Sequence, residues 1–184
     1  MTFTSCELPG LIVCEPTVFC DSRGYFFEAY NQTLFQKNGI DLNFVQDNQS
    51  RSSQGVIRGL HYQLNPHAQV KLVRVLEGAI LDVAVDIRKG SPTFGKHFSI
   101  ELSADNKRQL YIPAGFAHGF SVLTETASVL YKCDQSYNKE SEGGIRFDDP
   151  DLNIDWKMDL SQAIVSPKDL ELPSLKDSIT NFQY

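Results

Sequence analysis

The chain has 184 residues, of which 41% are hydrophobic, and this length suits one domain, 1–184, with a full apolar core. Its formal net charge of -6 argues against a general nucleic-acid binder, because neutralising phosphates requires a basic face. The first residues lack the basic and apolar regions of a signal peptide and the apolar runs are too short to span a membrane, so we expect a cytoplasmic protein without membrane contact.

The first distinctive stretch is "DSRGYFFEAY". Gly24 marks a turn directly after Arg23, and Phe26 and Glu28 then fall on one face of the chain. This run combines a cation, an aromatic ring and an acid near the N-terminus, so it could pack on another subunit.

Helices are predicted to be few and peripheral. In "NQTLFQKNG", Asn31 is a suitable N-cap and Gly39 a suitable stop. A helical C-terminal tail is predicted over 166–184. It begins with a short helical turn that has Ser166 as N-cap, Pro167 at the first helical position and Asp169 as a first-turn acid. Asp169 has a second reading, as a carboxylate that orients a histidine ring.

Strand-like segments dominate the middle of the chain, and glycine, proline and Asn/Asp clusters separate them. The predicted strands are 44–50, 56–63, 70–77, 80–87, 97–102, 109–112, 119–123 and 128–137. This pattern is typical of antiparallel sandwiches and barrels. The sequence therefore indicates an all-β jelly roll, the double Greek-key fold of the cupins, with its core strands over 44–137.

The stretch "RGLHYQ" poses a geometric problem within one of these strands. Arg58 and His61 are three residues apart, so in a regular strand their side chains point to opposite faces. A bulge or twist at Gly59 would bring both to one face. Alternatively, the long Arg58 side chain reaches over the end of the strand. In either case the two residues would make separate contacts along one long ligand.

A metal site is the first function to test in a cupin, which usually binds its metal through an HxH pair, a glutamate and a later histidine. Here the HxH position reads His61-Tyr62-Gln63, and Glu77 lies beyond the usual spacing. His118 could be a last ligand, but two histidines do not make a catalytic site, which needs about three protein ligands. We therefore predict no metal, and His61 is then free to act as an acid or base.

His61, Lys71 and Tyr131 form a possible catalytic set. Each alone is ordinary, because a strand histidine or tyrosine is often a core residue and a strand lysine is often solvated. Together they supply what proton abstraction beside a carbonyl requires: a base, a cation for the enolate oxygen and an acid on the other face.

Further aromatic and polar residues are candidates for ligand contacts. Tyr131 and Tyr137 would lie about 20 Å apart on one face of a straight strand, which suits an elongated ligand. Gln46 and Asn48 share a face, with Asp47 opposite. These amides either bind a polar ligand or are solvated at a sheet edge.

These motifs together resemble the dTDP-4-dehydrorhamnose 3,5-epimerases over nearly the whole chain. The matching stretches, in order, are "DSRGYFFEAYN", "FVQDNQS", "VIRGLHYQ", "QVKLVRV", "DVAVDIRKGSPTFG", "LYIPAGFAHGF", "LYKCDQSYN", "SEGGIRFDDPDLNIDW" and "SPKD". Tyr62, where phenylalanine is common, and Val70, where glycine often stands, are mild departures that remove no functional group.

The resemblance implies a cupin without metal or cofactor, normally a homodimer, that inverts C3 and C5 of dTDP-4-dehydro-6-deoxy-D-glucose to give dTDP-4-dehydro-L-rhamnose. It implies that His61 is the base, oriented by Asp169, that Lys71 stabilises the enolate and that Tyr131 is the acid. Tyr137 would stack on the thymine, helped by the residue matching Phe26 on the partner subunit. The other positions that match substrate contacts are Arg23, Glu28, Gln46, Asp47, Asn48, Arg58, His118, Glu142 and Lys168.

Two alternatives remain open on the residues alone, and a third fails. A relative could invert only C3 or accept another nucleotide sugar, since such enzymes share the catalytic set. A non-catalytic cupin could bind a sugar nucleotide, although the complete set argues against it. A metal-dependent dioxygenase is the alternative that fails, because this chain offers too few candidate metal ligands.

Overall fold

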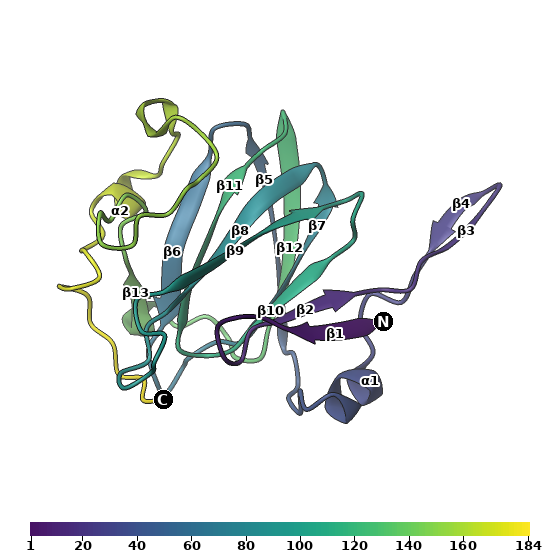
Figure 1. Ribbon diagram of the computed structural model, residues 1–184, viewed down its shortest axis with the longest axis horizontal. Coiled ribbons are helices and arrows are strands. Elements are labelled where there is room, and N and C mark those ends of the chain that lie inside the picture. Colours follow the sequence, from purple (N-terminus) through teal and green to yellow (C-terminus); the bar gives the residue numbers. More distant parts are fainter.

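The computed structural model describes all of residues 1–184, and most of its strands form two facing antiparallel sheets (Figure 1). The larger sheet has the order β1-β2-β10-β7-β12-β5 and the smaller one β13-β6-β11-β8-β9. The strands are β1 Thr2–Ser5, β2 Ile12–Glu15, β5 Gln46–Ser53, β6 Ile57–Gln63, β7 Lys71–Glu77, β8 Ala79–Asp86, β9 His97–Ser103, β10 Gln109–Ile112, β11 Phe116–Val122, β12 Thr126–Cys133 and β13 Glu142–Gly144. The chain crosses between the sheets at nearly every connection after β5, so the predicted cupin-type jelly roll is confirmed.

Apolar side chains fill the space between the sheets and cover the outside of the smaller sheet. β8 is buried on both faces: Ile80 and Ala84 pack between the sheets, and Leu81 and Val83 pack on the outer side. Trp156, from the segment that follows β13, closes that outer core. The C-terminal part of the chain therefore lies against the smaller sheet (Figure 1), which positions it near one end of the sandwich.

The helices are short. α1 Gln32–Lys37 begins after Asn31, whose side chain accepts a hydrogen bond from the Leu34 N–H, and Gly39 follows its end with φ of 82°. The two 3-10 helices are η1 Lys139–Ser141 and η2 Leu160–Gln162. None of the helices is both long and apolar enough to cross a membrane.

The C-terminal tail is mostly irregular, which corrects the prediction of a helical tail. Only α2 Pro167–Leu170 is helical, and it begins after the predicted N-cap Ser166. Pro173 cannot continue a helix, and the tail beyond it bonds other segments instead, as in the 2.7 Å hydrogen bond from the Tyr62 hydroxyl to the Ile179 carbonyl.

The last predicted strand is also shorter than expected. β12 ends at Cys133 and does not continue to Tyr137. The Asp134 carboxylate accepts a hydrogen bond of 2.7 Å from the backbone N–H of Val70, which holds the chain in a bend just after the strand. Tyr131 and Tyr137 are therefore not on one straight strand.

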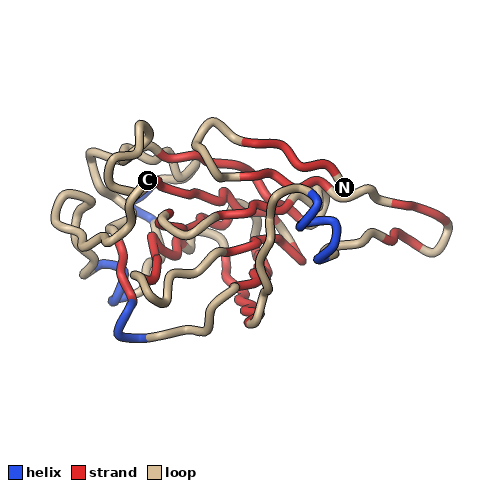
Figure 2. The backbone as a smooth tube through the Cα atoms, turned by 90° about the horizontal axis from the view of Figure 1, so that it is seen from below, coloured by secondary structure: helices blue, strands red, loops and turns tan.

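A small hairpin projects from one end of the sandwich (Figures 1 and 2). It consists of β3 Phe19–Asp21 and β4 Gly24–Phe26, and Gly24 has φ of 128° at its turn. The predicted turn at Gly24 is confirmed. Because the hairpin stands away from the two sheets, all residues of its two strands are exposed.

Candidate active site

Two adjoining cavities between the sheets form one cleft. Their volumes are about 540 and 620 Å³. Both cavities are lined by His61, Lys71, Tyr131, Glu142 and Lys168. These side chains come from both sheets and from the C-terminal tail, so the junction of the two cavities is the candidate reacting centre.

Asp169 orients His61 at this junction. Its Oδ1 lies 2.7 Å from Nε2 of His61, and its Oδ2 accepts a hydrogen bond of 3.2 Å from the backbone N–H of Gly59. Burial alone would raise the pKa of the Asp169 carboxyl, but these hydrogen bonds outweigh burial and keep its pKa below the ordinary value. Because a carboxylate only accepts, Nε2 donates its proton to Asp169 and Nδ1 of His61 keeps a free lone pair.

The helical cap at α2 coexists with this arrangement. The Ser166 hydroxyl accepts a hydrogen bond of 3.1 Å from the backbone N–H of Asp169. The backbone of Asp169 thus belongs to the cap while its side chain reaches His61. The predicted cap is confirmed, and the role of Asp169 in orienting a catalytic base stays a prediction.

A bulge at Gly59 brings Arg58 and His61 to one side of β6. His61 pairs with His118 of β11 while Arg58 pairs with Phe120, so β6 has one residue more than its neighbour. Gly59 has φ of 116°, a conformation that residues with side chains rarely adopt. Both Arg58 and His61 line the same cavity as a result, so of the two routes that the sequence left open the structure shows the bulge at Gly59.

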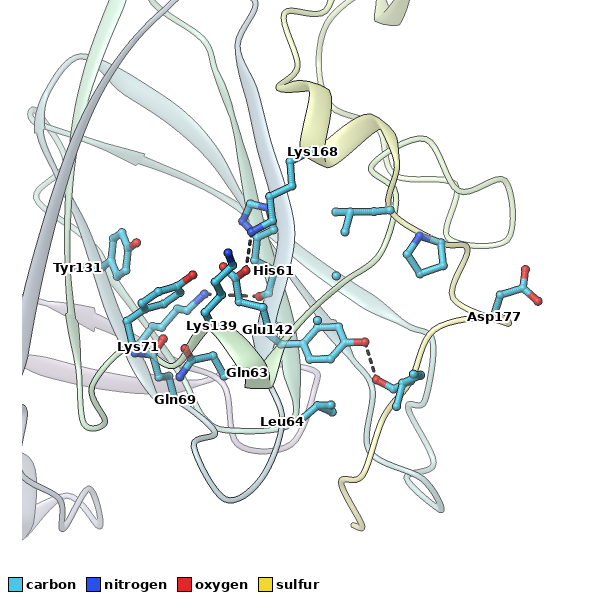
Figure 3. A pocket seen from close by; sticks show the side chains of 17 residues that line it. His61, Gln63, Leu64, Gln69, Lys71, Tyr131, Lys139, Glu142, Lys168 and Asp177 are labelled. Carbon is cyan, nitrogen blue, oxygen red and sulfur yellow. Dashed lines mark hydrogen bonds and ion pairs between the residues drawn. The ribbon is translucent and has the colours of Figure 1, made fainter.

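Lys71 and Tyr131 approach this centre from the other sheet (Figure 3). The Lys71 ammonium lies 3.5 Å from the backbone oxygen of His61 and 5.8 Å from the centroid of the Tyr131 ring. Burial lowers the pKa of Lys71, against the opposing effect of Cys133 and Asp82. Burial also raises the pKa of Tyr131, so the phenol holds its proton at neutral pH and can act as an acid.

Three more predicted residues line the cleft beside this centre. Lys168 Nζ lies 2.6 Å from Glu142 Oε2 (Figure 3). This hydrogen bond raises the pKa of Lys168, whereas that of Glu142 falls because its hydrogen bonds outweigh burial. Tyr137 is 55% exposed, and its backbone N–H donates to Gln46 Oε1 at 2.9 Å. An exposed ring at the cleft is free to stack on a flat ligand ring.

The amide-rich strand β5 divides as its alternation predicts. Asn48 lines the cleft. Asp47 lies on the opposite face, 2.9 Å from Lys132, and lines neither cavity. Gln46, on the same face as Asn48, lines neither cavity but donates a hydrogen bond of 3.1 Å to Asn48 Oδ1. The structure therefore brings Asn48, but neither Gln46 nor Asp47, to the lining of the candidate site.

Arg23, Phe26 and Glu28 lie on or beside the projecting hairpin and line neither cavity of the cleft. Arg23 lies 2.6 Å from Asp21 within the hairpin, and Phe26 is 70% exposed. The predicted contacts of these residues with a neighbouring subunit remain a prediction.

His118 reaches the cleft with a partner that sequence reasoning missed. Its Nε2 lies 2.8 Å from Oδ1 of Asp82 on β8, and both side chains are buried. The available signal was a single acid inside the apolar run "AILDVAV". No group of three or more His, Cys, Asp or Glu side chains is arranged to hold a metal ion.

Comparison with known proteins places the chain in a family. The family model described as dTDP-4-dehydrorhamnose 3,5-epimerase matches residues 5–177. A protein of that name from Shigella flexneri is 51% identical over 171 residues, which cover 92% of this chain and 93% of the relative.

Two solved structures are similar to this chain over nearly its whole length. The dTDP-4-dehydrorhamnose 3,5-epimerase of Elizabethkingia anophelis NUHP1 has 54% identity and a TM-score of 0.92, and the match covers 96% of this chain and 97% of that one. A 3,5-epimerase from Legionella pneumophila Philadelphia 1, solved in complex with dTDP-4-keto-L-rhamnose, has 47% identity and a TM-score of 0.92 over 96% and 93% of the two chains. The chain therefore belongs to the dTDP-4-dehydrorhamnose 3,5-epimerase family.

Proposed function

We propose that this chain inverts C3 and C5 of dTDP-4-dehydro-6-deoxy-D-glucose to give dTDP-4-dehydro-L-rhamnose, with His61 as the base and Tyr131 as the acid. Its family membership makes it an epimerase of dTDP-rhamnose biosynthesis. The observation that carries the roles is the hydrogen bond from His61 to Asp169, which leaves the other ring nitrogen free in a cleft shared with Tyr131.

The reaction needs no electron transfer. The C4 carbonyl makes the hydrogens on C3 and C5 acidic, because the electron pair left by either proton can move onto the carbonyl oxygen. His61 takes the proton, the Lys71 ammonium stabilises the resulting enolate, and Tyr131 returns a proton to the opposite face of the same carbon. Solvent then reprotonates the phenolate and deprotonates the imidazolium, and the cycle can repeat at the second carbon.

Asp169 contributes in the proton-abstraction step. When His61 becomes imidazolium, the adjacent carboxylate stabilises the new positive charge and holds the ring in position. The lowered pKa of Asp169 supports this role, because the group stays ionised wherever the enzyme would work.

The rest of the cleft suits the nucleotide part of the substrate. Arg58 and Lys168 line it as cations for a diphosphate, and the exposed ring of Tyr137 is suited to thymine. The complex of the Legionella relative with a dTDP sugar supports this substrate class. The other proposed contacts within the chain are Gln46, Asn48, His118 and Glu142.

We also propose a homodimer in which Arg23, Phe26 and Glu28 complete the site of the partner subunit. Support comes from the projecting hairpin and from its exposed rings, since Phe19, Tyr25 and Phe26 are 60–70% exposed. Co-refolding an Arg23→Ala chain with a His61→Ala chain should restore activity, because a mixed dimer would contain one intact site. No recovery in a verified mixed dimer would exclude the shared site.

A cytoplasmic location is part of the proposal. It rests on the substrate, because nucleotide-activated sugars are made from nucleoside triphosphates in that compartment.

The decisive experiment is incubation with the dTDP-4-keto sugar in deuterated water, with deuterium followed at each carbon by NMR. The proposal expects deuterium at both C3 and C5 of the product. His61→Ala should abolish this exchange while dTDP still binds. Exchange at C3 alone would identify a C3 epimerase, and no exchange at either carbon with the wild-type protein would refute the proposed function.

A further inference from the structure

Two histidine–aspartate pairs each bring a histidine to the cleft, and they differ chiefly in burial. Nε2 of His61 lies 2.7 Å from Asp169, and Nε2 of His118 lies 2.8 Å from Asp82. The two histidines lie opposite each other on β6 and β11. In both pairs the carboxylate accepts the Nε2 proton and Nδ1 keeps its lone pair. The side chain of His61 is 43% exposed, whereas that of His118 is only 7% exposed.

Burial decides what the free Nδ1 of His118 can do. Protonation would create a charged imidazolium, and burial disfavours that form and lowers the pKa of His118. The positive charges of Lys71 and His61 act in the same direction, and only Asp82 opposes them. His118 therefore stays neutral and is a poor base, but its lone pair remains a good hydrogen-bond acceptor.

The fold alone does not explain the carboxylate of Asp82. The side chain is 0% exposed, and its Oδ2 is buried without a hydrogen-bond partner. Asp86 on the same strand is equally buried, yet its oxygens bond Arg88, Ser91 and Thr93. A buried polar atom without a partner costs about 1–3 kcal/mol. The arrangement at Asp82 is therefore one that a purely structural acid would avoid.

We propose that Asp82 is a positioning residue that fixes the ring of His118, so that Nδ1 of His118 accepts a hydrogen bond from a hydroxyl of the hexose. This inference rests on the proposed function, whose substrate carries hydroxyls on C2 and C3 of the sugar. The lone pair would repel the C4 carbonyl oxygen, which has no proton to donate. The pair thereby favours the orientation in which that carbonyl meets Lys71 and a hydroxyl meets His118.

Asp82→Asn tests the positioning role. It preserves the shape of the side chain but removes the carboxylate, which can only accept hydrogen bonds. The asparagine amide can also donate to Nε2, which would reverse the ring tautomer and turn Nδ1 into a donor. We expect KM for the dTDP-4-keto sugar to rise about 5- to 10-fold with little change in kcat, as the loss of one hydrogen bond predicts. Binding of dTDP, which has no hexose, should stay within twofold of wild type.

Two substitutions of His118 distinguish a role as hydrogen-bond acceptor from a role as general base. His118→Asn places an amide oxygen near the position of Nδ1, whereas His118→Gln places its amide near Nε2. The Asn variant should retain more kcat/KM than the Gln variant, and deuterium entry at C3 and C5 should change in parallel. Asp86→Asn is the matched control on β8 and should lower Tm without raising KM.

Two results would overturn the inference. If His118→Asn abolished exchange at one carbon and spared the other, His118 would be a second base. If Asp82→Asn lowered Tm and weakened dTDP and sugar binding equally, Asp82 would be only structural. Failure of the proposed function is distinguishable from both, because it would already appear as missing exchange in the wild-type protein.

Discussion

Asp169 holds the ring of His61 at 2.7 Å although 108 positions separate the two residues in the chain. The hydrogen bond joins α2, in the C-terminal tail, to the middle of β6. The same carboxylate also accepts the N–H of Gly59 at the bulge. One side chain thus orients the proposed base and fixes the backbone that brings Arg58 to the cleft.

Asp169→Asn should lower kcat/KM by about 10²- to 10⁴-fold, because the variant no longer stabilises the imidazolium form of His61. Binding of dTDP should change little, since the effect is confined to proton abstraction. Steady-state kinetics and dTDP titration measure the two quantities. Asp148→Asn, at a surface acid outside the cleft, is the control and should match wild type. A rate within twofold of wild type for Asp169→Asn would contradict the assigned role.

The same variant should have a pH-dependent effect on stability. The pKa of Asp169 is lowered below its ordinary value of 3.8 in the folded protein. Its ionised form therefore stabilises the fold above that ordinary value, and this contribution disappears as the pH falls through the lower folded pKa. Urea unfolding should show wild type more stable than Asp169→Asn at pH 7, with a smaller difference near pH 3. A difference that grows on acidification would exclude this linkage.

Gly59→Ala should destabilise the protein by more than about 2 kcal/mol through backbone strain and collision. A Cβ at Gly59 would lie 2.6 Å from Cα of Gly119 and 2.7 Å from the backbone oxygen of His118. Gly39 is a matched control, because it also has positive φ but no atom within 4 Å of an added Cβ. Gly39→Ala should cost only about 1 kcal/mol. Equal losses in chemical denaturation would show that the collision with β11 does not matter.

The predicted strands match β5 to β12 closely, because alternating or continuous apolar residues and their turn signals are local properties. The N-terminal strands β1 to β4 were missed, since they are short and, apart from β2, mostly exposed, so they lack the apolar pattern that marks the equally short β10. The end of β12 was also missed, because the bend after Cys133 depends on a bond between Asp134 and Val70, which are 64 positions apart.

The residues of the candidate site also fall into two groups, those that local sequence pattern predicts and those that depend on contacts between distant segments. Local pattern singled out His61, Lys71 and Tyr131, but only the pairing of strands in two sheets shows that they line one cleft. Asp169 had two readings because a cap is satisfied locally, whereas its bond to His61 depends on the path of the whole tail. Asp82 could not be predicted, because a single acid in a buried strand indicates a function only once its partner on the neighbouring strand, His118, is known.

Tyr131→Phe should separate proton removal from inversion. The variant keeps the His61–Asp169 pair and the Lys71 ammonium, so protons should still leave C3 and C5 and return from the same face. Deuterium should then enter recovered substrate with its original stereochemistry, while product formation falls by about 10²- to 10⁴-fold. NMR of the recovered sugar in deuterated water measures both.

His61→Ala is the contrasting variant, because it should stop exchange altogether. Normal inversion by Tyr131→Phe would mean that another group supplies the proton on the second face.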